Sequence, residues 1–302
     1  MKPTYHSGEL KVQMKAGAIE AANHVGRTIL PIIAHVFVEF IQSQPMAILG
    51  SVDANGMTWA SVLCGRPGFM AVMDERTLQI DALPDEAGPL GESLRDDNEL
   101  GLLIIDFSTR RRLRLNGIVV QGLDGFSVRT RQVYSNCPRY IQARICELSN
   151  HDFPSSRSVQ KSAALSEELQ QWIRNADTFF IASFHPLGGA DASHRGGFPG
   201  FVQVVDERTI IWPDYNGNGM FNTLGNIIEN PNVGLLFVDF EQGGTLQLSG
   251  TANIVWDKEQ VVLFPGAERI VEFKIRKVIK TENATALRWK FVNYSSDNPW
   301  FC

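Results

Sequence analysis

The feature that most constrains the fold of this 302-residue chain is an internal repeat. The segment GRPGFMAVMDERTLQI (65–80) aligns with GFPGFVQVVDERTIIW (197–212) at an offset of 132 residues, and both contain the tetrad Asp-Glu-Arg-Thr. LGLLIIDF matches VGLLFVDF, and LRLNG matches LQLSG, at an offset of 133. A one-residue insertion between the blocks is typical of a loop. The sequence therefore predicts two halves of similar structure.

Each half carries the same series of predicted elements. Residues 37–41 and 169–173 have apolar side chains at i, i+3 and i+4, which predicts a helix, and Ser166 is a plausible N-cap for the second one. Hairpins follow at the Asp-Glu-Arg-Thr turns, and FNTLGNIIENP predicts a short helix that stops at Asn230-Pro231. Short strands around one helix favour a small closed or split β-barrel. The predicted fold class is mainly β with some α, as tandem split barrels packed into an intramolecular pseudo-dimer.

The same patterns divide the chain into four parts. Residues 1–43 are predicted to form a helical segment that packs on the barrels, and residues 44–150 the first barrel. Residues 151–176, polar, rich in serine and containing Pro154, are predicted to form a linker followed by a helix. Residues 177–302 are predicted to form the second barrel.

Composition excludes several broad classes. The net charge of −5 is not that of a general nucleic-acid or membrane-surface binder. The sequence has no run of about 18 apolar residues, and its first residues lack a signal-peptide pattern, so a cytoplasmic protein is expected. The four cysteines, Cys64, Cys137, Cys146 and Cys302, include no CxxC pair. No metal site is predicted, and structural roles are expected for these thiols.

The second half resembles a known family of cofactor-binding barrels. The matching segments are SHRGGFPGFVQVVDERTIIWPDYNGNGMFNTLGNIIENPNVGLLFVDF and TLQLSGTA, and the first half adds YSNCPRYIQ (134–142). They resemble the FMN-binding split barrel of pyridoxamine 5'-phosphate oxidase and its relatives, and YHSGELKVQ (5–13) resembles the start of a two-barrel subgroup. The resemblance implies an FMN in the cleft between two barrels, with its phosphate held by one and its ring partly covered by the other.

Candidate phosphate ligands gather around the helix start in PDYNGNGMFNTLGN. Helix N-termini bind anions, and Asn218, Asn222 and Thr223 can donate to phosphate oxygens. Gly217 and Gly219 let the backbone approach closely. The cations usual in the family at the helix start are replaced by Asn222 and Thr223, which puts weight on Arg195.

Further cofactor contacts are implied by the resemblance. Pro199, Gly200 and Phe201 would meet the ring through backbone groups, and Gln203 would lie near its pyrimidine side. An equally plausible reading of Pro199 and Gly200 is a structural turn, because GRPGF in the first half has the same form. Ser193, His194 and Gly196 flank Arg195 in the same candidate site, and Asp214 would hold a ribityl hydroxyl or fix the turn.

The two halves differ at the predicted site. Opposite Ser193, His194 and Arg195 we align Val62, Leu63 and Cys64, and the first cation after them is Arg66. The segment DALPDEAGPLGESLRDD before the first half's short helix is acidic, which disfavours a dianion. We therefore expect one FMN site, in the second half, and a degenerate one in the first.

The basic segment STRRRLRLNG of the first half allows two interpretations. It is either a solvated turn or a hairpin that a two-fold arrangement carries to the other barrel's flavin, with Arg112 as the contact residue. Arg139 and Tyr140 are candidates to line the same cleft.

The predicted function is that of an FMN-dependent oxidoreductase whose substrate and electron donor the sequence leaves open, with no catalytic residue assigned. Partners would be a small-molecule substrate or donor, or a reductase protein, and the chain would act as a monomeric pseudo-dimer or a homodimer. One alternative is a haem-binding or haem-degrading split barrel with His185 or His194 as iron ligand. The other is a non-catalytic flavin-binding module.

Overall fold

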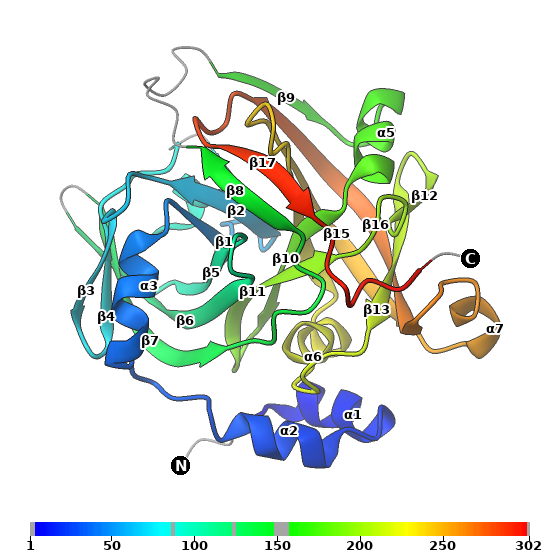
Figure 1. Ribbon diagram of the computed structural model, residues 1–302, viewed down its shortest axis with the longest axis horizontal. Coiled ribbons are helices and arrows are strands. Elements are labelled where there is room, and N and C mark those ends of the chain that lie inside the picture. Colours follow the sequence, from blue (N-terminus) through cyan, green and yellow to red (C-terminus); the bar gives the residue numbers. More distant parts are fainter. Residues whose placement is uncertain (1–3, 86–87, 123–124, 148–156, 301–302) are drawn as a thin grey trace.

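Two β-sheets with the same strand order form the body of the protein (Figure 1). The computed structural model describes residues 4–85, 88–122, 125–147 and 157–300. The first sheet has the order β2-β1-β5-β6-β7-β4-β3 and the second β11-β10-β14-β15-β16-β13-β12, with β9 paired to β16. The first sheet comprises β1 (Met46–Val52), β2 (Thr58–Cys64), β3 (Met70–Asp74), β4 (Thr77–Ile80), β5 (Glu99–Asp106), β6 (Arg111–Gln121) and β7 (Phe126–Ser135). The second comprises β9 (Ser158–Ser162), β10 (Thr178–His185), β11 (Gly189–Gly196), β12 (Gln203–Asp206), β13 (Thr209–Tyr215), β14 (Asn232–Val238), β15 (Thr245–Val255) and β16 (Ala267–Glu282).

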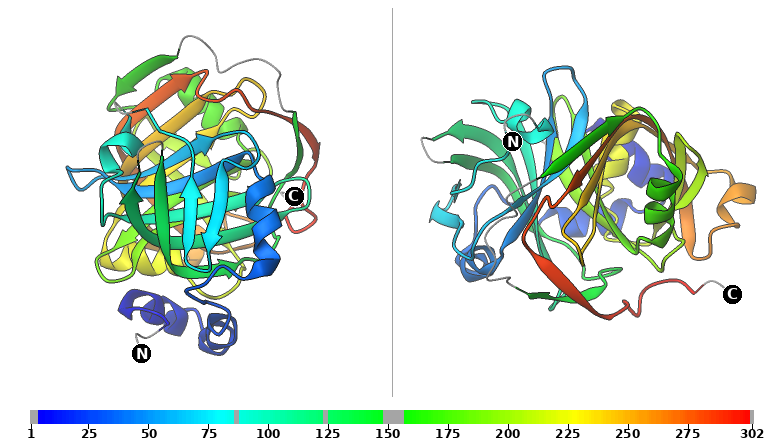
Figure 2. Two further views of the ribbon diagram at one scale, coloured as in Figure 1. Left: turned by 90° about the vertical axis from the view of Figure 1, so that its left-hand side faces the viewer. Right: turned by 90° about the horizontal axis from the view of Figure 1, so that it is seen from above.

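Short helices flank the sheets, as the apolar periodicity predicts. Ser166 caps the helix after it by accepting from the backbone N–H of Leu169, as predicted. The N-terminal helices lie outside both sheets at one end of the molecule (Figure 2). The helices are α1 (Ser7–Lys15), α2 (Ile19–Gly26), the 3₁₀ turn η1 (His35–Phe37), α3 (Val38–Ser43), α4 (Pro89–Ser93), α5 (Glu167–Asn175), α6 (Asn222–Glu229) and α7 (Lys258–Val261).

Three large apolar cores account for most of the packing among the described residues, and a small fourth cluster, which includes Tyr5 and Tyr134, holds the N-terminal helices. One lies inside the first sheet and includes Leu102 and Leu115, and one lies inside the second and includes Leu235 and Leu248. The third joins the two halves and combines Ile48 and Leu103 of the first with residues of the second, among them Phe180. The predicted architecture of tandem split barrels packed as a pseudo-dimer is thus confirmed.

Two glycines at equivalent positions allow the barrels to touch. A Cβ on Gly101 of β5 would lie 2.6 Å from the Cα of Asp191 in the second barrel. A Cβ on Gly234 of β14 would lie 2.5 Å from the Cα of Trp59 in the first. Real Cβ atoms do not approach backbone atoms this closely, so both sides of the interface require glycine. The reciprocal contacts are those of a pseudo-two-fold arrangement.

The ends of the two halves also pair with each other. Strand β8 (Ala143–Glu147), which follows the first barrel, runs antiparallel to β17 (Arg288–Asn293), which follows the second. The region predicted as a linker contributes β9 to the second sheet, where Lys161 pairs with Ile279, so it is more than a connection. The part of the predicted linker that contains Pro154 lies outside the described residues, as does Cys302. Within the described chain, every helix is too short or too polar to cross a membrane.

Candidate cofactor-binding site

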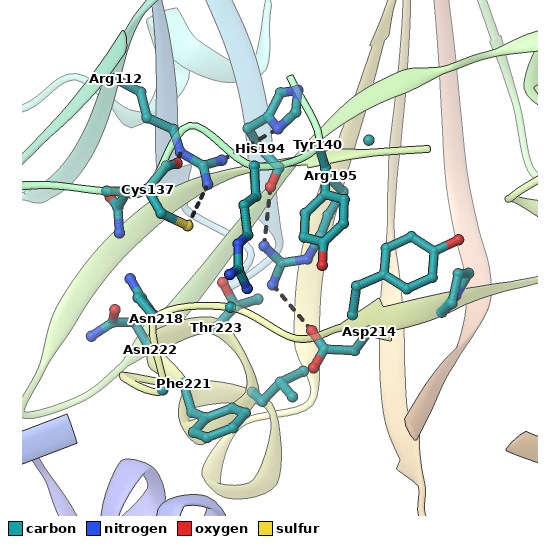
Figure 3. A pocket seen from close by; sticks show the side chains of 18 of the residues that line it. Arg112, Cys137, Tyr140, His194, Arg195, Asp214, Asn218, Phe221, Asn222 and Thr223 are labelled. Carbon is teal, nitrogen blue, oxygen red and sulfur yellow. Dashed lines mark hydrogen bonds and ion pairs between the residues drawn. The ribbon is translucent and has the colours of Figure 1, made fainter. Parts of the chain in front are cut away.

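A pocket lies between the barrels, where the start of α6 meets β11 and the first barrel's β6 (Figure 3). Its volume is about 100 Å³. Sites for whole drug-sized ligands measure roughly 300–1,000 Å³, so the enclosed part suits a phosphate-sized group. Nine of the predicted site residues line it: Arg112, His194, Arg195, Gly196, Phe201, Asp214, Asn218, Asn222 and Thr223. Arg139 and Tyr140, the candidates to line this cleft, also do so, as do Gly217 and Gly219, which were expected to let the backbone approach closely. The remaining lining residues are Arg114, Asn136, Cys137, Pro213, Tyr215, Phe221 and Leu224.

The pocket carries an excess of positive charge. Its described lining includes four arginines and a single carboxylate, that of Asp214. Arg112 and Arg114 are two positions apart on β6, so their side chains leave the strand on the same face, toward the second barrel. Arg112 thus lies at the second barrel's pocket, where the hairpin interpretation expects it, and its contact with a flavin stays a prediction. Such a cluster attracts an anion.

Arg195 is the arginine at the centre of the pocket. Figure 3 shows its guanidinium between the main-chain oxygen of His194 and the carboxylate of Asp214, at 3.1 Å and 3.9 Å respectively. Burial is the main cause that lowers the pKa of Arg195, while Asp214 opposes the shift. Its Nε is buried without a hydrogen-bond partner among the described residues. Asp214 also faces the buried Arg269, at 3.6 Å, so one carboxylate lies between Arg269 and the partly buried Arg195.

A second arginine, Arg114, belongs to the same basic segment as Arg112 and connects the two barrels. Its Nη1 donates to Asp191 at 3.1 Å and to the Oδ1 of Asn222 at 3.3 Å, and its Nη2 donates to Ser193. Ser193 in turn lies 2.9 Å from the Thr223 hydroxyl. Although burial opposes the charge, Asp191 and Tyr134 raise the pKa of Arg114. The side chains of Ser193, Asn222 and Thr223 are thus engaged within the protein and position this arginine against α6.

The start of α6 offers backbone donors to the pocket. Phe221, the N-cap, is left-handed with φ 60°, and the described part of the chain provides no side-chain cap there. The first N–H groups of a helix have no partner within the helix, and they can bind an anion. Asn218 shapes the preceding turn by accepting from the N–H of Met220 at 3.1 Å.

Glu9 of α1, which the sequence analysis does not single out, also contacts the site. Its carboxylate accepts from the amide of Asn222, behind the start of α6. Burial raises the pKa of Glu9 to about 7, partly offset by the hydrogen bonds from His6 and Asn222. The predicted N-terminal helical segment therefore supports the site from outside the barrels.

His194 occupies a defined tautomer in this environment. Arg112 has only donors, and its Nη1 lies 3.3 Å from Nδ1 of His194, so Nδ1 accepts and Nε2 carries the proton. Burial and then the charges of Arg112 and Arg195 hold the pKa of His194 well below its usual range. The imidazole is therefore neutral at pH 7.

Four predicted residues do not line the pocket: Ser193, which is buried against Arg114, and three that lie away from it. Pro199 and Gly200 are exposed in a turn, where the N–H of Gly200 donates to the carbonyl of Arg174 in α5 at 2.8 Å. Gly68 makes the same contact with Gln42 in the first barrel, at 2.7 Å, which supports the structural reading of this turn. Gln203 is exposed at the start of β12. These residues contribute no side chain to the pocket described here.

The predicted alignment of the two halves at β11 is wrong by one residue. Arg195 pairs with Phe179 in β10, and at the equivalent place in the first barrel Leu63 pairs with Ala47. Ser61, Val62 and Leu63 therefore correspond to Ser193, His194 and Arg195. The absence of a cation at the Arg195 position still holds, because Leu63 stands there, whereas the serine is common to both halves.

Comparison with known protein families gives a match to part of the chain. Residues 165–292 match the family model described as pyridoxamine 5'-phosphate oxidase. The second barrel is thus similar to this family. The match covers α5 through most of β17 and so includes the pocket's second-barrel residues. No curated protein matches the chain.

The similar solved structures described below each match less than half of this chain. HupZ of Group A Streptococcus is 14% identical with a TM-score of 0.31, covering 44% of this chain and 98% of its own. A protein of the pyridoxinephosphate oxidase family from Clostridium acetobutylicum is 11% identical with a TM-score of 0.31, covering 41% and 92%. The FAD-binding protein of Mycobacterium smegmatis is 17% identical with a TM-score of 0.28, covering 40% and 98%.

Proposed function

We propose that the chain binds FMN through its phosphate in this pocket and works as a flavin-dependent oxidoreductase. The observation that carries the proposal is the Nε of Arg195, which is buried and unpartnered in the described structure, in a pocket lined by three further arginines. A buried donor without an acceptor is costly, and a phosphate oxygen would satisfy it. The match of residues 165–292 to the family model and the resemblance to FMN-binding split barrels make FMN the first cofactor to test.

In this proposal the chain's own residues do the binding and positioning. Arg195 and the first N–H groups of α6 would hold the phosphate, while Arg112 would add charge from the first barrel. Arg114, through Asp191 and Asn222, would keep the first barrel against the start of the helix. Bound FMN would supply the hydride or electron transfer, which requires mainly orientation from the protein. The electron donor would be a small molecule or a reductase protein.

The hydrogen bonds of the two candidate histidines argue against the haem alternative. A neutral histidine ligates a metal through a nitrogen that bears no proton. On His194 that nitrogen is Nδ1, which accepts from Arg112. On His185 it is also Nδ1, which accepts from the N–H groups of Leu187 and Gly188 at 3.1 Å and 2.9 Å. Neither lone pair is available for iron in this structure.

The absorption spectrum of the purified protein tests the proposal. A two-band flavin spectrum, or its appearance after FMN is added to colourless protein, is the expected result. Anaerobic bleaching by NAD(P)H or by a reductase then distinguishes an oxidoreductase from a passive flavin carrier. A Soret band, or failure to take up FMN at all, would contradict flavin binding.

A further inference from the structure

A second, larger cavity lies on the opposite side of the barrel interface. Its volume is about 970 Å³, within the range of sites for drug-sized ligands. It is built from the elements equivalent to those of the arginine-rich pocket: β2 in place of β11, the segment before α4 in place of that before α6, and β15 in place of β6. The pseudo-two-fold arrangement therefore gives the molecule two related sites of different character.

Neutral side chains replace the three arginines at the depth of this second cavity. Leu63 stands where Arg195 stands, as the strand pairing shows. Thr245 pairs with Val238 as Arg112 pairs with Ile105, so these two positions correspond, and Gln247 likewise corresponds to Arg114. At each of these three positions the second cavity has an uncharged side chain where the arginine-rich pocket has an arginine.

The short helix at this cavity is also unsuited to a phosphate. Helix α4 has five residues, with Pro89 in its first turn and the acidic Glu92 close behind. Proline has no N–H to donate, and an acidic side chain repels an anion. In the other site the corresponding helix α6 has eight residues and no acidic residue in its first turn.

Apolar side chains dominate the inner lining instead, namely Val62, Leu63, Phe69, Leu90 and Ile279, and the exposed Val159 adds to the lining near the surface. The polar side chains Gln247 and Cys64 in the interior of this cavity have hydrogen-bond partners within the protein. The amide nitrogen of Gln247 donates to the Ala60 carbonyl at 2.8 Å and to the Ser61 hydroxyl at 2.9 Å. Cys64 accepts from Thr285 at 3.3 Å, and burial raises the pKa of its thiol to about 12, so it stays neutral.

Charged groups occur only at the exposed rim among the described lining residues. Three basic residues there, Arg66, Arg157 and Lys161, are balanced in part by Asp81 and Asp85. Exposed charges of mixed sign contribute little to the binding of a ligand held below them. The interior, not the rim, therefore determines which ligand fits.

We infer that this cavity binds an uncharged, largely apolar organic molecule of drug size, such as an aromatic or alicyclic compound. The site is separate from the flavin site proposed above, and its ligand class follows from volume, apolar lining and the loss of the three arginines. Burial of apolar surface would supply the affinity, and the Thr245 and Thr281 hydroxyls would orient the ligand.

Titration with the neutral fluorophore N-phenyl-1-naphthylamine tests the inference. We expect saturable binding of one probe per chain and binding at least about 10-fold weaker in Ala82→Trp, which places a large side chain in the cavity. Leu187→Trp adds the same side chain at an exposed turn outside the cavity and is the matched control. Circular dichroism spectra identical to wild type establish that both variants fold.

Two further measurements test where the probe binds and which class of ligand the cavity prefers. Arg195→Leu alters only the arginine-rich pocket, so the probe should bind this variant as it binds wild type. The sulfonated analogue 8-anilinonaphthalene-1-sulfonate, with nearly the same rings, should bind more weakly. The inference is overturned by equal probe affinity in the two tryptophan variants, by a changed affinity in Arg195→Leu, or by tighter binding of the sulfonate. None of these readouts depends on FMN, so they stand apart from the test of the proposed function.

Discussion

Arg114 of the first barrel and Asp191 of the second form a buried ion pair, with Nη1 3.1 Å from Oδ1 and both side chains less than a tenth exposed. The pair lies beneath the candidate site and crosses the interface between the barrels. At the equivalent place in the other site, Gln247 stands where Arg114 does and Trp59 where Asp191 does. The contact therefore belongs to only one of the two related sites.

Breaking this ion pair should destabilise the protein. Arg114→Gln leaves the Asp191 carboxylate buried and uncompensated, at a cost of about 3–5 kcal/mol in the free energy of unfolding. Asp191→Asn should cost a similar amount. The double variant should lose clearly less than the sum of the two, because neither charge is then left alone. Urea denaturation of all three checks this, and additive losses would contradict the pairing.

Replacing Arg195 tests the phosphate contact. Arg195→Leu gives the site the residue that the other barrel has, and should weaken FMN binding about 10- to 100-fold, since a charge-assisted contact contributes roughly 1.5–3 kcal/mol. Riboflavin, which lacks the phosphate, should lose far less. Fluorescence titration with both flavins separates the phosphate contact from general damage to the pocket.

The matched control for this experiment is Arg66→Ala. Arg66 is an exposed arginine at the rim of the second cavity, and its removal should leave FMN affinity unchanged. Equal losses of FMN affinity in the two variants would refute the prediction of a single flavin site.

The buried carboxyl of Glu9 should make stability fall as pH rises between about 4.5 and 7. Its pKa is raised from 4.5 to about 7, so within this window the folded state binds more protons than the unfolded one. The stabilisation from Glu9 is fully present below pH 4.5 and fully lost above pH 7. Between these values the free energy of unfolding falls by at most about 1.4 kcal/mol per pH unit.

Neighbouring His6 has the opposite effect in nearly the same window. Burial is the main cause that lowers its pKa to about 4, so the unfolded state binds the extra proton between about pH 4 and 6.5 and stability rises with pH there. Glu9→Gln should therefore show a steeper rise of stability from pH 4.5 to 6.5 than wild type does. Denaturation at four pH values measures it, and parallel profiles would count against a buried, titrating Glu9.

The paired glycines at the barrel interface should not tolerate even a methyl group. Gly101→Ala and Gly234→Ala each place a Cβ against the opposite backbone and should lower the free energy of unfolding by about 1–3 kcal/mol or more. Gly244→Ala is the control, because its Cβ would meet neighbours only at 3.5 Å and beyond. Thermal unfolding compares the three, and equal midpoints would contradict the close approach.

Much of the fold could be predicted because the repeat preserves patterns that depend on local sequence. The hairpins at the Asp-Glu-Arg-Thr turns and the helix that Ser166 caps follow from turn chemistry and periodicity. Strand β9 was missed because Ser158–Ser162 is short and exposed, and only its pairing with β16 makes it a strand.

The candidate site was predicted in part, and for the same reason. Arg195 and Arg112 could be found because each differs from its counterpart in the other half. The one-residue error between β2 and β11 arose because the strand pairing that determines the register is not visible in the sequence. Glu9 could not be found at all, since it reaches Asn222 from more than two hundred residues away through packing of α1 on α6.

The covalent joining of the two barrels has a consequence for how their sites can change. In a dimer of identical subunits, a substitution in one site appears at the same time in its symmetry mate, so both must serve the same ligand. In this chain Arg195 and Leu63 are encoded separately, so each can change without the other. The shared interface at Gly101 and Gly234 stays intact when they do. One fold can thereby keep an anion-binding cleft and specialise its twin for a different molecule.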